Sequence, residues 1–246
     1  MPPNGYSEPM TAMLEDKRTG LQVAFVDAVV ESGRDSSVHQ ALQENLQVWY
    51  SSGATPLWLN TFRNRGDCRL VCLVENFTSF ESLMLDQIRS VAGVRETRTA
   101  FSFSGSADLD LLLDLEMEVL PHTEACSAFL EVTVAPGQDR SVQERCTMLP
   151  ADDPVRVVWS LNSYNGQADD LSLLLLGSPG ADLAEFTMRH IRSMEGVVAT
   201  EMDQIWDWTW MAQPDSVIAL CEHFAAEHIL EDGFDDLDRF YADVDW

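Results

Sequence analysis

The stretch IRSVAGV at residues 88–94 is written again as IRSMEGV at residues 191–197. A longer stretch upstream is repeated as well, because AFVDAVVESGRDSSV at 24–38 corresponds to AFLEVTVAPGQDRSV at 128–142. In both repeats, the second copy follows the first after nearly the same length of chain. Similarity on this scale indicates one structural unit used twice. The repetition therefore predicts a scaffold and does not by itself name a ligand.

Each copy is predicted to fold in the order β-α-β-β-α-β. Apolar residues alternate at the start of each copy, which is typical of a strand, and a Gly-x-Asp turn then precedes the first helix. Two strands follow, joined by the hairpin sequences NRGD at 64–67 and NGQAD at 165–169. The second helix ends at Gly93 or Gly196, where a helix C-terminus favours a positive φ. The expected helices are residues 36–48, 79–90, 139–147 and 182–193.

The predicted fold class is therefore α+β, with tandem duplicated ferredoxin-like βαββαβ units that pair with each other as a dimeric α+β barrel-like pseudo-dimer. Four parts of the chain are expected: an N-terminal extension at 1–20, a first ferredoxin-like domain at 21–119, a second at 120–212, and a C-terminal helix with an acidic tail at 213–246.

Two further segments have patterns of their own. ADLDLLLDLEMEV at 107–119 alternates apolar with acidic residues, which predicts a half-buried strand. WDWTW at 206–210 is predicted to place Trp206, Trp208 and Trp210 on one face of a strand. Such a face is typical of a core or of an interface with a partner protein, and the alternative is an aromatic wall for a ligand or haem.

Acidic side chains dominate the composition: 41 Asp and Glu oppose 15 Lys and Arg, for a formal net charge of −26. Phosphate contacts need clusters of Lys and Arg, so direct binding of nucleic acid is not expected. Such a surface repels itself in dilute buffer and is tolerated when salt screens it, which favours a halophilic protein over an ordinary acidic one.

The chain is expected to be cytoplasmic and not bound to a membrane. No apolar run approaches the length of a membrane span, and the first residues do not resemble a signal peptide. Five cysteines without a Cys-x-x-Cys pair favour a reducing compartment.

The stretch NGQADDLSLLLLGSPGADLAEFTMRHIRSMEGVVATEMDQI at 165–205 resembles the effector-binding (RAM) domain of the Lrp/AsnC regulators. The resemblance rests on a G-x-x-D hairpin, an acidic helix start and a Gly-Val turn before a strand that carries Thr. The matching residues are Gly166, Asp169, Asp182, Phe186, Gly196, Val197 and Thr200, and in the first copy, less closely, Gly66, Asp67, Gly93, Val94 and Thr97.

This resemblance implies a small-molecule sensor that binds an effector, such as an amino acid, near the hairpins. It also implies further assembly into homo-oligomers. The segment before Leu21 is too short for a helix-turn-helix, so such a regulator would lack its own DNA-binding domain. The candidate ligand-binding residues are Gly66, Asp67, Thr97, Asn165, Gly166, Asp169 and Thr200.

Two other functions remain open from the sequence. One is an enzyme of the dimeric α+β barrel kind, a monooxygenase or haem-binding protein, which needs no nucleophile elbow, phosphate loop or dinucleotide fingerprint, all of them absent here. The other is an assembly or adaptor protein that uses the Trp strand or the acidic tail as its contact surface.

No catalytic residue, metal ligand or cofactor is assigned from the sequence. HFAAEH at 223–228 spaces its histidines five residues apart, which separates them by about 140° on a helix and disfavours zinc. His122 and His190 lack a neighbouring ligand at metal-binding spacing and are predicted to be surface or core residues.

The charge composition predicts that salt stabilises the fold. The midpoint of thermal unfolding should rise between dilute buffer and molar KCl, because the salt screens repulsion between carboxylates. Thermal denaturation followed by circular dichroism at several KCl concentrations measures this directly. A midpoint that stays constant or falls would contradict the halophilic interpretation.

Overall fold

The computed structural model describes residues 21–49, 53–102, 104–108, 126–149, 154–164, 169–211 and 216. The first half contains β1 (Gln22–Val30), α1 (Asp35–Gln47), β2 (Ala54–Phe62), β3 (Cys68–Val74), α2 (Phe77–Ser82), the π-helix η2 (Leu83–Ile88), β4 (Val94–Ser102) and β5 (Gly105–Ala107). The second half contains β6 (Cys126–Val134), α4 (Asp139–Thr147), β7 (Val155–Tyr164), β8 (Asp169–Gly177), α5 (Leu183–Phe186), the π-helix η3 (Thr187–Ile191) and β9 (Val197–Trp210).

The described strands form one antiparallel sheet in the order β4-β1-β3-β2-β9-β6-β8-β7-β5. A further pairing of β4 with β7, at Phe101 and Tyr164, joins the two ends of this order and closes the sheet into a barrel. Each half has the strand order of a ferredoxin-like unit, and the long strand β9 crosses from its own half to pair with β2. The predicted mixed α+β class is confirmed.

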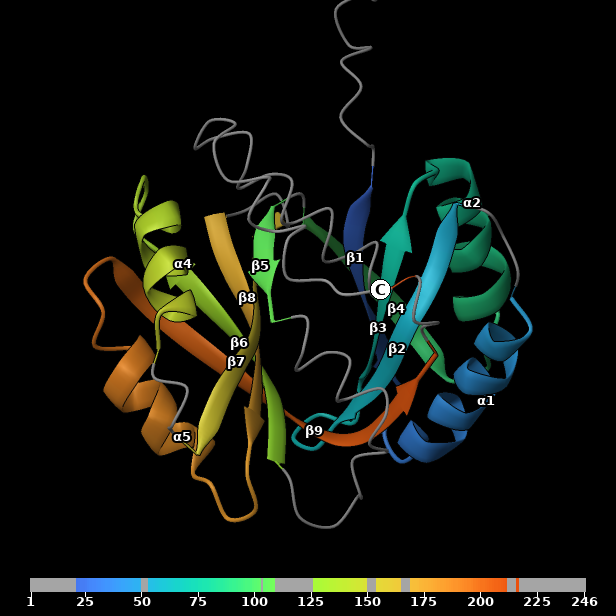
Figure 1. The fold of residues 1–246 in the computed structure, drawn as a ribbon. Helices are drawn as coiled ribbons and strands as arrows, with labels where there is room; N and C mark the ends of the chain where they lie inside the picture. Colours follow the sequence, from blue (N-terminus) through green and yellow to red (C-terminus); the bar gives the residue numbers. More distant parts are fainter. Residues whose placement is uncertain are drawn as a thin grey trace, which may run out of the picture.

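The helices cover the outside of the barrel, with α1 and α2 against the first half and α4 and α5 against the second (Figure 1). Apolar layers lie between each pair of helices and its sheet, and a third apolar cluster fills the barrel interior. Side chains from both halves form this interior cluster, including Phe25, Trp58, Phe62, Val71, Phe129, Trp159, Leu161 and Leu174. The two halves are therefore held together by a shared core.

Two stacked tryptophans lie in the middle of that core. The rings of Trp58 and Trp159 are 4.7 Å apart between centroids, and both side chains are fully buried. They occupy corresponding positions, because each follows a register shift in its strand and pairs with a residue of the neighbouring strand, Val71 or Leu174. Trp208 and Trp210 also stack on Trp58, and we call this part of the barrel the aromatic end.

The prediction that the three tryptophans of WDWTW share one face is wrong. The pairing of β2 with β9 shifts register between Thr61 and Phe62, which pair with Asp207 and Ile205 and leave Trp206 as an extra residue. This bulge reverses the alternation. Trp206 is 63% exposed, under the guanidinium of Arg63, whereas Trp208 and Trp210 pack on the interior core.

The repeated seven-residue stretches begin at the last residue of a π-helix in both halves, a feature that the sequence did not predict. Hydrogen bonds from residue i to i+5 bring Ile88 above Leu83 on the sheet-facing side, whereas an α-helix would separate the two by about 140°. The predicted glycines are confirmed: Gly93 has a φ of +106°, and an added Cβ would lie 2.9 Å from Val38 Cγ2. Gly196 has a φ of +93° in the second half.

Several predicted elements lie outside the described residues. These are the strand at 107–119 from residue 109 onward, the HFAAEH segment, and the C-terminal helix and tail apart from Ser216. Among the helices that the structure does describe, none is long and apolar enough to cross a membrane.

A buried arginine, Arg69, also links the two halves. Arg69 Nε donates to Asp27 Oδ1 at 2.6 Å, and Arg69 Nη1 donates to Glu131 Oε1 at 2.7 Å in the opposite half. Burial would raise the pKa of Asp27, but the charge of Arg69 lowers it overall. Burial raises the pKa of Glu131, and its contact with Arg69 only partly opposes this shift.

Replacing Arg69 should destabilise the protein strongly. Arg69→Ala leaves two inward carboxylates without their cation, which typically costs about 3–5 kcal/mol of unfolding free energy. Arg98→Ala is the matched control, because Arg98 pairs with Glu96 on the surface and its loss should change the unfolding free energy far less than the loss of Arg69. Urea denaturation of both variants gives the comparison, and equal losses would show that Arg69 does not link the halves.

Candidate functional site

Two side chains of the predicted effector site, Asp67 and Thr97, make hydrogen bonds within the first half. Asp67 Oδ1 accepts a hydrogen bond from the backbone N–H of Val30 at 3.0 Å, and Gly66 forms the preceding turn with a φ of +68°. Thr97 is half-buried, and its Oγ1 accepts a hydrogen bond from Arg89 Nε at 2.8 Å. Asn165 and Gly166 lie outside the described residues, Asp169 begins β8, and Thr200 lies on β9 opposite Val132.

The structure brings together a different group of residues, around His39 of α1. His39 Nδ1 lies 2.7 Å from Thr61 Oγ1 on β2, and His39 Nε2 lies 2.9 Å from Thr209 Oγ1 on β9. Asp207 Oδ2, also on β9, lies 3.8 Å from Nε2. The site therefore combines residues of both halves. Sequence reasoning missed it because Thr61 and Thr209 lie 22 and 170 residues from His39 along the chain and form no local motif.

The environment of the His39 imidazole favours its uncharged form at neutral pH. Only 4% of the residue is exposed, and its two nearest partners are uncharged hydroxyls. Burial lowers the pKa of His39, and the carboxylate of Asp207 opposes this shift without cancelling it. A neutral imidazole hydrogen bonded on both sides has a fixed orientation and one nitrogen that can accept a proton.

The second half has only neutral groups at the corresponding place. Gln143 of α4 donates through Nε2 to the carbonyl of Ser160 at 3.0 Å, and its Oε1 lies 3.3 Å from Asn162 Nδ2. Asn162 Nδ2 also contacts Ser104 Oγ at 2.5 Å. An amide network of this kind cannot accept a proton near neutral pH, so the two halves differ in chemical capacity.

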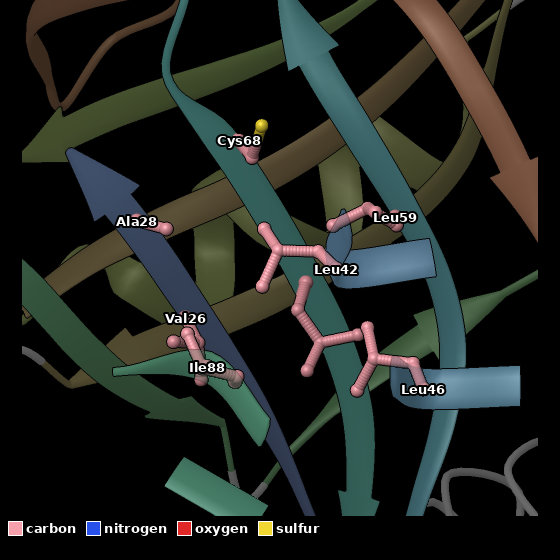
Figure 2. A pocket seen from close by; sticks show the side chains of 8 residues that line it. Val26, Ala28, Leu42, Leu46, Leu59, Cys68 and Ile88 are labelled. Atoms are coloured by element: carbon pink, nitrogen blue, oxygen red, sulfur yellow. The ribbon is translucent and has the colours of Figure 1, made fainter. Parts of the chain in front are cut away.

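An apolar pocket lies between the helices and the first-half sheet, and Cys68 in its lining contacts Thr61, the hydrogen-bond partner of His39. Side chains from β1, β2, β3, α1 and η2 converge there (Figure 2): Val26, Ala28, Leu42, Leu46, Leu59, Cys68, Leu70 and Ile88. Leu42 lies one helical turn beyond His39, and Leu59 lies two residues before Thr61 on the same strand. The pocket is closed in this structure and leaves no room for a water molecule.

The cysteine in this pocket is not a candidate nucleophile. Cys68 Sγ lies 3.6 Å from Thr61 Oγ1, and the residue is fully buried. Burial raises the pKa of the Cys68 thiol to about 11, and nucleophilic attack requires the thiolate. Among the described residues, no cluster of three or more His, Cys, Asp or Glu could hold a metal ion.

No family model matches the sequence, and no curated protein is detectably related to it. Solved structures do share the fold. A protein assigned as a monooxygenase from Fusobacterium nucleatum superimposes with a TM-score of 0.50 at 8% identity, over 78% of this chain and 95% of its own. An anthrone oxidase-like protein gives a TM-score of 0.50 at 7% identity, over 80% and 96% of the two chains.

A protein assigned as a monooxygenase from Lactobacillus acidophilus has a TM-score of 0.48 at 6% identity, with 78% and 97% of the chains covered. Matches over more than three quarters of this chain include parts of both halves. The chain therefore shares its overall fold with the Fusobacterium nucleatum protein and the anthrone oxidase-like protein.

These neighbours contradict the expected regulatory function. The Lrp/AsnC resemblance rested on turn glycines, an acidic helix start and strand positions, which any ferredoxin-like unit needs for its backbone. The two solved proteins that share this fold are assigned as a monooxygenase and described as anthrone oxidase-like, which favours the enzyme alternative over the sensor.

The titration of His39 tests the electrostatics of the site. Its pKa should lie below the ordinary value of about 6.5, and Asp207→Asn should lower it further, because the carboxylate that favours the charged imidazole is lost. Folding favours neutral His39, so its contribution to stability is present above about pH 6.5 and is lost as the pH falls through the lower folded-state pKa. NMR titration of the imidazole, assigned with His39→Gln, measures the shift; a rise in Asp207→Asn would contradict this electrostatic account.

Proposed function

We propose that this protein is an enzyme of the monooxygenase or oxidase type that uses His39 as a general base on a small apolar substrate. The observation that carries the proposal is a buried, neutral histidine with a carboxylate close to one ring nitrogen, at the edge of the packed apolar layer between α1 and the first-half sheet. The fold is shared with oxygenase-like proteins, but a fold alone does not specify chemistry, so the argument rests on this site.

The site suits removal of a proton from carbon or oxygen of an aromatic substrate. Neutral His39 accepts the proton, and the carboxylate of Asp207 stabilises the imidazolium that forms. The apolar lining excludes water from the anion left behind. This electron-rich anion can then react with dioxygen, as in the overall conversion of anthrone and O2 into anthraquinone and water.

The chemistry is assigned to the first half only. We regard the two halves as copies of one ferredoxin-like unit, in which α1 carries His39 where α4 carries Gln143. The second copy keeps the fold and supplies Asp207 and Thr209 through β9. One copy thus completes the site of the other.

Haem, which the sequence left open as a cofactor, does not fit this histidine. Both ring nitrogens of His39 are within hydrogen-bond distance of threonine hydroxyls. Binding to haem iron would require one of these hydrogen bonds to be lost, whereas a proton can reach Nε2 through the Thr209 hydroxyl with both bonds in place.

Substrate entry requires the helices to separate from the sheet. The segment best placed to move is η2, because π-helical turns are frequent at functional sites and Ile88 ends η2 in the pocket wall. Leu42 and Leu46 of α1 form the opposite part of that wall.

His39→Gln, which installs the residue of the second half, should abolish most of the activity. Loss of a general base typically lowers the rate by about 100-fold or more. The measurement is oxygen uptake with anthrone as the probe substrate, together with the appearance of anthraquinone. The wild-type rate should rise with pH through the lowered pKa of His39 and then level off, because only neutral His39 accepts a proton.

Gln143→Ala in the second half is the matched control and should retain the wild-type rate within about twofold, which fits a site confined to the first half. Thermal unfolding confirms that each variant is folded. An active His39→Gln variant, or wild-type protein that consumes no more oxygen than buffer, would exclude this function.

A further inference from the structure

Asn60 of β2 is the polar residue that the fold explains least. It points into the barrel interior between Trp58 and Phe62, and its side chain is fully buried. Neither Oδ1 nor Nδ2 has a hydrogen-bond partner among the described residues. Flipping the side-chain amide, which exchanges the positions of Oδ1 and Nδ2, would therefore still leave both atoms without a hydrogen bond. Buried amides are almost always paired, so an orphan of this kind calls for a functional explanation.

The barrel itself does not need an amide at this position. In the second half the corresponding residue is Leu161, two residues after the stacked Trp159, as Asn60 is two residues after Trp58. Leu161 is fully buried in the same apolar core. Leucine therefore satisfies the packing, and asparagine lowers the stability of the ligand-free protein.

The surroundings of Asn60 are aromatic on the side of β9. Its partner across β2 and β9 is Trp208, whose ring stacks on Trp58 with centroids 5.6 Å apart. The indole N–H groups of Trp58 and Trp159 are also buried and have no acceptor within the part of the chain that the structure describes. Arg69, its partner on β3, is already paired with Asp27 and Glu131 and offers no free charge.

We propose that Asn60 and the tryptophan stack form a binding site for a flat, uncharged aromatic molecule whose edge carries an N–H donor next to a carbonyl or ring-nitrogen acceptor. Such an edge, as in an aromatic lactam, matches the side-chain amide with two parallel hydrogen bonds: Asn60 Nδ2 donates to the ligand acceptor, and Asn60 Oδ1 accepts from the ligand N–H. Asparagine reads the edge of adenine by the same two-bond geometry.

The ligand takes the place of the Trp208 ring. Trp208 is only half-buried at the aromatic end, so its side chain can turn outward. A flat ligand stacked on Trp58 replaces the ring contact that is lost when the Trp208 indole moves away. The ligand also forms two hydrogen bonds with Asn60 that the indole cannot make. This exchange explains why the closed interior keeps an unsatisfied amide.

The site is separate from the proposed catalytic site. Thr209 reaches His39 on the outer face of β9, whereas Trp208 lies on the inner face. Binding in the barrel interior therefore does not depend on the general-base function, and His39→Gln should leave it unchanged.

Calorimetric titration with phenanthridin-6(5H)-one, a flat tricyclic lactam, tests the proposal. Wild-type protein should bind it saturably, and the N-methyl derivative, which keeps the rings and carbonyl but lacks the N–H, should bind at least tenfold more weakly. Asn60→Leu should lose at least tenfold in affinity while raising the midpoint of thermal unfolding by about 2–4 °C, since the orphan amide is removed. Trp208→Ala should bind more tightly, because no ring has to be displaced.

Several outcomes would overturn the site. These are an absence of saturable binding to both wild type and Trp208→Ala, equal affinity for the two ligands, or unchanged affinity in Asn60→Leu. A lower unfolding midpoint in Asn60→Leu would show that the amide has a structural partner. The two-ligand comparison uses wild-type protein alone and so decides the question even where a variant does not fold. Loss of binding in His39→Gln would place the ligand at the catalytic site instead.

Discussion

Closure of the sheet is the constraint on which the rest of this structure depends. A closed barrel of this size leaves an interior just wide enough for side chains, so each inward residue of one half must fit a residue of the other. The Trp58–Trp159 stack meets this requirement at the centre, where corresponding positions of the two halves face each other. Strand β9 then extends past its own half, and its last residues build both the outer site at His39 and the inner stack.

The residues with a proposed function are ones that differ between the two halves. The halves match in strand order, in the stacked tryptophans, in the π-helices and in the turn glycines, and these shared features maintain the barrel. They differ at two corresponding positions. The first half has His39 where the second has Gln143, and it has Asn60 where the second has Leu161. The second half keeps the same strand order with Gln143 and Leu161, so the shared fold does not require His39 or Asn60, and we attribute these two residues to function.

The sequence predicted the scaffold better than the sites. Periodicity located α1, α4 and the turn glycines Gly93 and Gly196, because these depend on local backbone preferences. The π-helices and the bulge that exposes Trp206 were missed, since both arise from packing and pairing with distant strands. His39 and Asn60 were missed for a related reason: their environments are built by β2, β3 and β9, and neither residue carries a local motif.

In the first half, one row of cross-strand partners begins with uncharged side chains and ends with charged ones. Trp208, Asn60, Arg69 and Asp27 are successive partners across β9, β2, β3 and β1, whereas the corresponding row in the second half contains Leu161, Ser172 and Glu131. Arg69 is neutralised by two carboxylates, so this part of the row is satisfied internally. Asn60 is the member of the row whose amide stays without a partner, and a closed core keeps such a group only at the expense of stability. Asn60 therefore lies between the ion network of Arg69 on one side and the half-buried ring of Trp208 on the other, and we assign its amide to the aromatic side, where none of the described charged groups competes for it.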